Sequence, residues 1–348
     1  MEPMPIAATQ PQRRGWLKVG FQIISSAVLL ALLIWRLPDV SFNDLGPSWT
    51  TSSLWLLVGS GTCMFIAYAL STLRWRSVIQ AVAAPPTFRR LLSHQLAGQF
   101  VSNVLPTAFG GDVVRIARLR ADLGDTSLAI ASVTIERLTG WLVLPAISLS
   151  ALAVARDLGS DHARNIAELI AIGTVVALGL VVVIAANRRW ARPMEAVAGW
   201  RKPLVAIHFM VDALRGSPRL ALQVLVSGLG FQITQCVAVW LAARAVGANE
   251  ITLIASLAFF PAAAIAQNVP IGFGGLGIRE AMFVLFFGSL GTSQSLAITT
   301  GLTVYLVTMV ASCAGLPSVV MWRRTHHQPI LGEQHMQTDQ PHTHDAPA

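Results

Sequence analysis

Apolar runs long enough to cross a membrane are the feature that most constrains this chain. A membrane-spanning α-helix needs about 20 consecutive, mostly apolar residues. Runs of this kind occur at 17–37, 54–73, 127–155, 166–186, 220–246 and 296–322. Only 12% of the 348 residues are charged, which is too few for the polar surface of a soluble domain. We therefore expect an all-α integral membrane protein folded as a helical bundle.

The basic residues indicate how this bundle is oriented. Arginine and lysine concentrate before the first run, in 74–90, in 187–219 and after residue 322, whereas 38–53 contains neither. Basic segments stay on the cytoplasmic side of a membrane. We expect both termini in the cytoplasm of a bacterium, with the chain integral to the inner (plasma) membrane. Residues 1–15 and 323–348 are then cytoplasmic tails, the second disordered, and 16–322 is a single membrane domain.

Two further apolar segments do not fit as single spans. Residues 74–90 and 115–120 are both basic and belong on one side, so 91–106 has to enter the membrane and return. Because successive spans alternate between the two sides of the membrane, 251–290 has to enter from the opposite side and return there. Irregular backbone at membrane depth is tolerated only where it packs inside protein or lines a cavity. Two re-entrant segments therefore predict a binding site inside the bundle.

The two re-entrant segments share a motif. Matching residues, at identical spacing, are Pro106, Phe109, Gly110, Gly111 and Arg115 in the first and Pro270, Phe273, Gly274, Gly275 and Arg279 in the second. The motif defines two repeats, at about 54–155 and 220–322, joined through the basic connection 187–219. Their opposite orientation predicts inverted repeats, each containing a re-entrant broken-helix hairpin. Such repeats are typical of transporters with a site near the bilayer midplane.

Each motif has residues suited to a broken helix that binds an anion. The prolines end the inbound helix, and the Gly-Gly pairs allow a tight reversal at positive φ. Asp112 is expected as the N-cap of the next helix. Arg115 and Arg279 lie one turn further, where a guanidinium can hold a phosphate with two parallel hydrogen bonds. A purely topological role is the alternative for each arginine.

Glu136 and Arg137 lie inside an apolar run, where a charge is costly and marks a functional site by default. Adjacent residues on a helix do not face each other. We expect Glu136 to pair with Arg115 or Arg118, and Arg137 to pair with Asp112 or with the substrate. A structural ion pair inside the bundle is the alternative.

Three further polar residues complete the candidate substrate-binding set. Glu280 is expected to act beside Arg279, and Asn103 and Asn268 are weaker candidates at the broken helices. The apolar regions contain no recognisable metal-ligand cluster or catalytic motif. We therefore expect neither a metal nor a cofactor, and no enzymatic activity.

The chain resembles the family named after the transmembrane region of lysylphosphatidylglycerol synthase. The residues that carry the resemblance are Leu73-Arg74-Trp75-Arg76, Asn103 to Pro106, Gly110-Gly111-Asp112 with Arg115, Ala131-Ser132-Val133 with Glu136-Arg137 and Gly140, and Pro270 to Glu280. The resemblance covers nearly all of 15–325. It implies two inverted units associated with moving polar lipids between leaflets. Only about 26 polar residues follow the last span, so transfer of an amino acid from tRNA is not expected.

These observations favour a lipid flippase or transporter whose substrate carries an anionic, phosphate-containing headgroup. An accessory subunit of an envelope lipid or glycan pathway is one alternative. An intramembrane enzyme acting on a lipid phosphate, with Asp112 or Glu136 as its base, is another. The expected partners are membrane lipids, with a second copy of the chain or an envelope-pathway enzyme left open. The basic residues follow the membrane topology, so nucleic acid is not expected.

Overall fold

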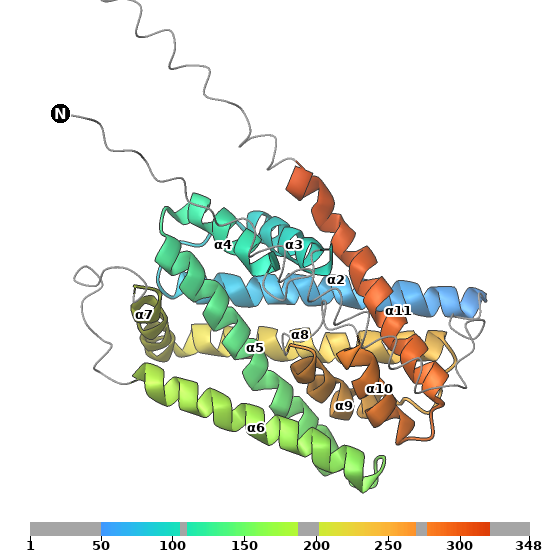
Figure 1. The fold of residues 1–348 in the computed structure, drawn as a ribbon. Helices are drawn as coiled ribbons and strands as arrows, with labels where there is room; N and C mark the ends of the chain where they lie inside the picture. Colours follow the sequence, from blue (N-terminus) through green and yellow to red (C-terminus); the bar gives the residue numbers. More distant parts are fainter. Residues whose placement is uncertain (1–49, 105–109, 187–201, 269–276, 321–348) are drawn as a thin grey trace, which may run out of the picture.

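The computed structural model describes residues 50–104, 110–186, 202–268 and 277–320, and every regular element within these ranges is helical (Figure 1). The elements are α2 (Thr51–Gln80), α3 (Phe88–Val104), α4 (Gly110–Leu123), α5 (Thr126–Val154), α6 (Asp161–Ala186), α7 (Lys202–Gly216), α8 (Pro218–Ala245), α9 (Leu253–Ala266), α10 (Ile278–Gly288), α11 (Gln294–Ser312) and the 3₁₀-helix η5 (Cys313–Gly315). The all-α fold expected from the sequence is confirmed.

Five of the described helices are long and apolar enough to cross a membrane. They are Thr51–Gln80, Thr126–Val154, Asp161–Leu180, Pro218–Ala245 and Gln294–Val320. These match the expected spans after the first. The expected first span at 17–37, both terminal tails and residues 187–201 of the basic connection lie outside the described residues.

Polar N-caps explain where several of these helices begin. The Asp125 carboxylate accepts hydrogen bonds from the backbone N–H groups of Ser127 and Leu128, at 2.6 and 3.1 Å, and thereby starts α5. Thr252 starts α9 and Ser293 starts α11 in the same way, each with its side-chain hydroxyl. Each cap supplies an acceptor for N–H groups that the first helical turn leaves without a partner.

The outer surface of the bundle is apolar. Trp55 on α2, Leu169 on α6 and Val310 on α11 are 71%, 70% and 73% exposed, and they are three of many large apolar side chains that face outward. A soluble monomer rarely exposes so much contiguous apolar surface, whereas lipid chains solvate it. The outward face therefore fits a lipid environment.

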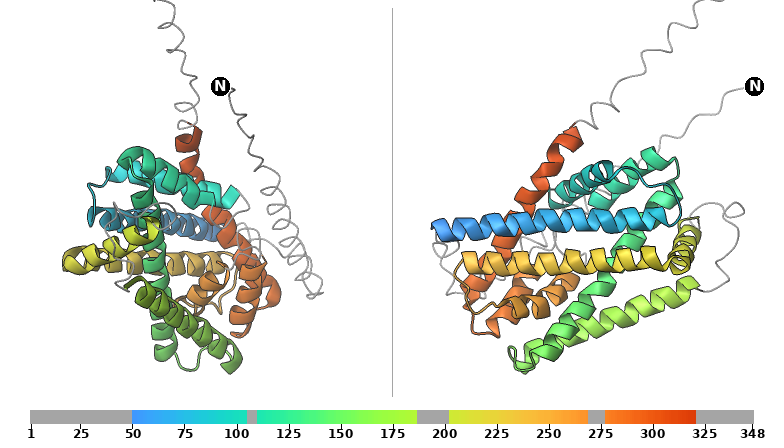
Figure 2. Two further views of the ribbon diagram at one scale, coloured as in Figure 1. Left: turned by 60° about the vertical axis from the view of Figure 1, so that its left-hand side comes forward. Right: turned by 180° about the vertical axis from the view of Figure 1, so that it is seen from behind.

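Helices α2 and α8 run side by side in opposite directions along the length of the bundle (Figure 2). The hydroxyl of Ser60 donates to the carbonyl of Ala238 at 2.8 Å, and Ser77 hydrogen-bonds Gln223 at 3.4 Å. As the residue number rises along α2, the number of its partner on α8 falls, which defines an antiparallel pair. These two helices open the two expected repeats.

The short helices form two hairpins that pack at opposite ends of α5 (Figure 1). In the first hairpin, α3 and α4 pack on the C-terminal part of α2 and the beginning of α5, through Trp75, Ile79, Leu91, Leu119 and Val133. In the second, Phe259 of α9 stacks on Phe286 of α10 with ring centroids 5.2 Å apart. This hairpin packs on the other ends of α5 and α8, through residues such as Leu152 and Val246.

None of the four hairpin helices is long enough to cross a bilayer alone. They contain 17, 14, 14 and 11 residues. At about 1.5 Å per residue they are roughly 17–26 Å long, against about 30 Å for a hydrocarbon core. Each half of the bundle thus has the same order of elements, a long helix, two short helices and a long helix.

The expected roles of Gly110, Gly111 and Asp112 are wrong. Helix α4 begins at Gly110, so both glycines are helical and neither has the positive φ of a tight turn. Asp112 lies in the first turn of α4 and does not form its N-cap. A glycine is needed at 111 because a Cβ there would collide with the carbonyl group of Gly98 on α3. Gly98 and Gly111 together let α3 and α4 cross closely.

We expect Gly111→Ala to destabilise the protein by about 1–3 kcal/mol, the usual effect of overpacking. The matched control is Gly173→Ala in α6, where a Cβ would have no atom within 4 Å. This control should leave the thermal midpoint unchanged or raise it slightly, because alanine favours a helix. Thermal unfolding of the purified variants in one detergent measures both. Equal midpoints would show that the close crossing does not limit stability.

Candidate functional site

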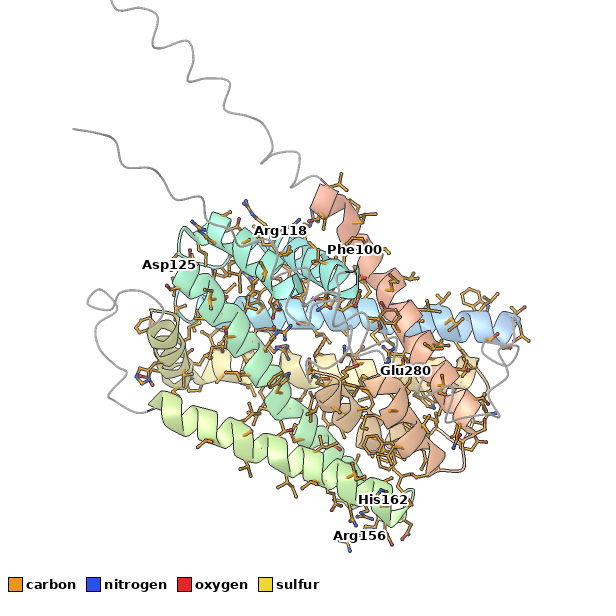
Figure 3. All side chains as sticks on the ribbon, viewed as in Figure 1. Phe100, Arg118, Asp125, Arg156, His162 and Glu280 are labelled. Atoms are coloured by element: carbon orange, nitrogen blue, oxygen red, sulfur yellow. The ribbon has the colours of Figure 1, made fainter. Side chains whose placement is uncertain are left out.

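A cavity of about 310 Å³ lies inside the bundle where the two hairpins approach each other. Glu136 on α5, Gln232 on α8 and Tyr305 on α11 line it, and each lies near the middle of its long helix. Figure 3 shows Asp125 at one end of α5 and Arg156 and His162 beyond the other, and Glu136 lies between these ends in the sequence of α5. The predicted site residues that line the cavity are Asn103, Gly111, Asp112, Arg115, Glu136, Arg137, Asn268 and Arg279.

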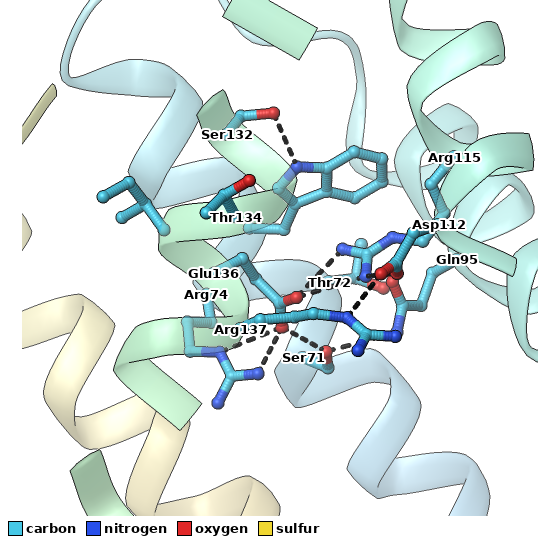
Figure 4. Close-up of polar contacts among 12 residues, drawn as sticks. Ser71, Thr72, Arg74, Gln95, Asp112, Arg115, Ser132, Thr134, Glu136 and Arg137 are labelled. Atoms are coloured by element: carbon cyan, nitrogen blue, oxygen red, sulfur yellow. Dashed lines mark hydrogen bonds and ion pairs between the residues drawn. The ribbon is translucent and has the colours of Figure 1, made fainter. Parts of the chain in front are cut away.

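The carboxylate of Glu136 joins two arginines from different helices (Figure 4). Arg115 of α4 donates from both terminal nitrogens to Oε2, each at 3.1 Å. Arg74 of α2 donates to Oε1 through Nε at 3.1 Å and through Nη2. All three side chains are nearly fully buried, with 3–5% of the side chain exposed. This triad connects the first hairpin to two spanning helices.

Neighbouring side chains fix the positions of this triad. Ser71 donates to Glu136 at 2.9 Å and accepts a hydrogen bond from Gln95 of α3 at 3.2 Å. The Arg115 guanidinium lies over the ring of Trp75, 4.3 Å from the ring centroid. The Trp75 indole in turn donates to Ser132 of α5 at 3.1 Å. A cation held between a ring and a carboxylate has little freedom to move.

Asp112 pairs with the remaining predicted arginine. Its Oδ2 lies 2.5 Å from Nε of Arg137, and its Oδ1 lies 3.6 Å from Arg115. Of the partners expected from the sequence, Arg115 for Glu136 and Asp112 for Arg137 are confirmed. Arg118, the other candidate for Glu136, donates to the Ser318 carbonyl at 2.9 Å and also to its hydroxyl.

The second hairpin supplies a separate ion pair. Arg279 donates to Glu280 Oε1 through Nε at 3.1 Å and through Nη2 at 2.5 Å. Adjacent residues do meet here, because Glu280 also accepts from the N–H of Gly277 at 2.6 Å and so folds back over the start of α10. Gly277 has φ +86°, a conformation that favours glycine. Arg279 lies 5.1 Å from the ring centroid of Tyr305.

The two predicted asparagines line the cavity at the ends of their helices. Asn103 donates to the hydroxyl of Ser312 at 3.0 Å, and its carbonyl accepts from Tyr305 at 3.1 Å. Asn268 donates to the carbonyl of Ala264 at 2.7 Å, which closes the end of α9. The other predicted turn residues, Pro106, Pro270, Gly274 and Gly275, lie outside the described residues.

Arg74 is the main cavity-lining residue that the sequence prediction misplaced. We expected it in a cytoplasmic loop, but α2 continues to Gln80 and Arg74 is 3% exposed. A signal was present in the sequence, since the apolar residues Trp75, Val78 and Ile79 follow Arg74 and are fully buried. Because these side chains are buried, the part of α2 that follows Arg74 still lies inside the bundle.

Among the described residues, four arginines and two carboxylates line the cavity. Glu280, behind Arg279, is a third carboxylate, so the group as a whole keeps a net positive charge. Nη1 of Arg74 and Nε of Arg115 are buried without a hydrogen-bond partner in the described chain. A buried N–H group without a partner is costly, and a bound acceptor would remove that cost. No group of three or more metal-ligating side chains occurs among the described residues.

The fold and site define a helical membrane protein with an arginine-lined cavity between two short hairpins. The chain belongs to the family of the lysylphosphatidylglycerol synthase TM region, and the sequence model of this family matches residues 22–315. It is similar to a UPF0104 membrane protein of Methanothermobacter thermautotrophicus, with 27% identity over 257 residues, which are 67% of this chain and 75% of the relative. A second UPF0104 membrane protein of that organism is 27% identical over 173 residues, 49% of each chain, so the match spans about half of that relative.

Proposed function

We propose that this protein moves a polar lipid with an anionic, phosphate-containing headgroup between the leaflets of the bacterial inner membrane. The observation that carries the proposal is the net positive cavity at mid-length of the spanning helices. Burying four arginines there is costly unless their charge is used. A phosphate can accept hydrogen bonds from several guanidinium groups at once. The free N–H groups of Arg74 and Arg115 are the first donors available to it.

The arrangement of the hairpins supports a transport cycle. The antiparallel α2 and α8, together with the hairpins at opposite ends of the bundle, support two inverted repeats with re-entrant hairpins. In this proposal both termini are cytoplasmic, and the first hairpin enters from the cytoplasmic side and the second from the outside. Rocking one repeat against the other would then open the cavity to each leaflet in turn.

The carboxylates favour binding over catalysis. A general base needs a carboxylate oxygen that is free to take a proton from the substrate. Both oxygens of Glu136 and both oxygens of Asp112 are directed at arginines. This is the arrangement of an electrostatic framework that holds cations in place, and it supports the transport proposal over an intramembrane enzyme.

Movement of labelled lipids in proteoliposomes tests the proposal. We expect the wild-type protein to move at least one phosphate-containing lipid between leaflets faster than protein-free vesicles do. Arg115→Ala and Arg279→Ala should slow that movement by about tenfold or more, since each removes a charged hydrogen-bond donor from the cavity. The test lipids are phosphatidylglycerol, its lysyl form, a hopanoid and a polyprenyl phosphate.

The same vesicles decide between transport and an accessory role. If the wild-type protein is folded but moves none of these lipids, the transport proposal fails and an accessory subunit of an envelope pathway becomes the better explanation. Monodisperse elution of each variant in detergent establishes that a slow variant is still folded.

A further inference from the structure

The cavity has a second wall, whose chemistry differs from that of the arginine-lined wall. Lining residues on α2, α4 and α5 include Arg74, Arg115 and Arg137 with their carboxylate partners. Those contributed by α8 to α11 in the described chain are uncharged apart from Arg279. Seven amide side chains line the cavity in total, together with Tyr305 and Thr308. Three of the arginines are thus gathered on one side, whereas the amides extend from α3 over α8 and the end of α9 and offer hydrogen bonds to a neutral group.

Two of these amides have an unused acceptor. Oε1 of Gln95 and Oε1 of Gln232 are buried and have no hydrogen-bond partner among the described residues. The two side chains come from different halves of the bundle and are 2% and 5% exposed. A buried carbonyl oxygen without a donor is costly, so its ligand should bring an O–H or N–H group.

A cationic ligand group would find no available carboxylate among the described residues of the cavity. Glu136 and Asp112 direct both oxygens at arginines, and Glu280 uses one oxygen for Arg279 and the other for the N–H of Gly277. An ammonium group would therefore enter a net positive cavity without an available carboxylate. Like charges placed together in a desolvated site repel strongly. The donor that Gln95 and Gln232 require should be a neutral hydroxyl.

We propose that the site selects a phosphodiester lipid whose headgroup is an uncharged polyhydroxyl group, and that it rejects cationic headgroups such as lysyl esters. This inference rests on the proposed function and adds the class of headgroup to it. The phosphate lies against Arg74 and Arg115, and the hydroxyls reach Gln95 and Gln232. Hydroxyls both donate and accept, which suits a wall of amides. The volume of about 310 Å³ fits one headgroup and leaves the acyl chains outside.

Binding of short-chain lipids to the full-length protein in detergent tests this proposal without measuring transport. Titrations followed by native mass spectrometry would compare phosphatidylinositol, phosphatidylglycerol, phosphatidic acid and lysyl-phosphatidylglycerol. We expect phosphatidylinositol to bind about tenfold tighter than phosphatidic acid, because a site built for hydroxyls rejects a ligand that lacks them. Lysyl-phosphatidylglycerol should bind about tenfold more weakly than phosphatidylglycerol. Glycerophosphoinositol, which has no acyl chains, would reveal whether a soluble solute also binds.

Gln232→Leu should reduce the preference for phosphatidylinositol over phosphatidic acid to about twofold, while phosphatidic acid binds as before. Gln223→Leu is the matched control on the same helix, since Gln223 is exposed and does not line the cavity. The inference is overturned if the wild-type protein binds lysyl-phosphatidylglycerol most tightly, shows no headgroup preference or retains no lipid. A clear preference in binding without leaflet movement would instead overturn the transport proposal alone.

Discussion

Replacing Glu136 with alanine is expected to lower the free energy of unfolding by about 3–5 kcal/mol, the range measured when one partner of a buried ion pair is removed. Arg74 and Arg115 both depend on this carboxylate, and both are nearly fully buried. Without it, two guanidinium groups remain in a low-dielectric interior with only aromatic faces and, for Arg115, the more distant Asp112 to stabilise their charge. The first hairpin would also lose its main polar connection to α2 and α5.

Glu136→Gln separates the charge from the shape of this side chain. It should destabilise the protein almost as much as alanine, since an amide can accept hydrogen bonds but does not neutralise two cations. Glu168→Ala is the matched control, because Glu168 forms a partly exposed i,i+4 pair with Arg164 and should cost about 1 kcal/mol or less. Chemical unfolding in detergent measures all three variants. If Glu136→Ala is as stable as Glu168→Ala, the triad is not a stabilising element.

Arg137→Gln is expected to slow lipid movement by about 30-fold or more, which corresponds to losing a charged interaction worth roughly 2 kcal/mol. Arg137 is the most exposed of the four cavity arginines. Its side chain is 28% exposed, against 4–7% for the side chains of the other three. Its partner Asp112 keeps Arg115 at 3.6 Å, so no carboxylate is left entirely unpaired. We therefore expect this variant to lose transport while its unfolding free energy falls by only about 1–2 kcal/mol.

Arg215→Gln provides the control for Arg137→Gln. Arg215 lies in the last turn of α7, its side chain is 57% exposed, and it does not line the cavity. This variant should move lipid at the wild-type rate in the same proteoliposomes. If Arg137→Gln moves lipid normally, or if Arg215→Gln is equally slow, the cavity arginine has no special part in transport.

The buried charges of the candidate site could be predicted because they interrupt apolar sequence. Glu136 and Arg137 stand inside a spanning run, and Asp112 and Arg115 follow the first motif, so a polar partner had to be near. The distribution of basic residues along the chain also indicated the two hairpin segments. Arg74 was not placed in the same way, because it stands at the end of an apolar run, and Arg76 and Ser77 interrupt the apolar residues that follow it.

Local glycine geometry was predicted less well. A Gly-Gly pair is compatible with a tight turn and with close helix packing, and sequence alone favoured the turn. The fold shows that Gly111 is helical and that its missing Cβ accommodates Gly98, which comes from another helix. The role of this glycine depends on its neighbour in space, which the surrounding sequence does not specify.

The sequence by itself determined that this is a helical membrane protein, which segments are long enough to span, and that charge is buried within them. These properties follow from hydropathy summed along a single helix, so neighbouring residues are sufficient to establish them. Only the tertiary structure decided which carboxylate each arginine meets. Arg74 and Glu136 are 62 positions apart and become partners because α2 and α5 approach each other at that level. The positions at which helices approach depend on the packing of the whole bundle, and so the cavity and its two walls appear only in the folded chain.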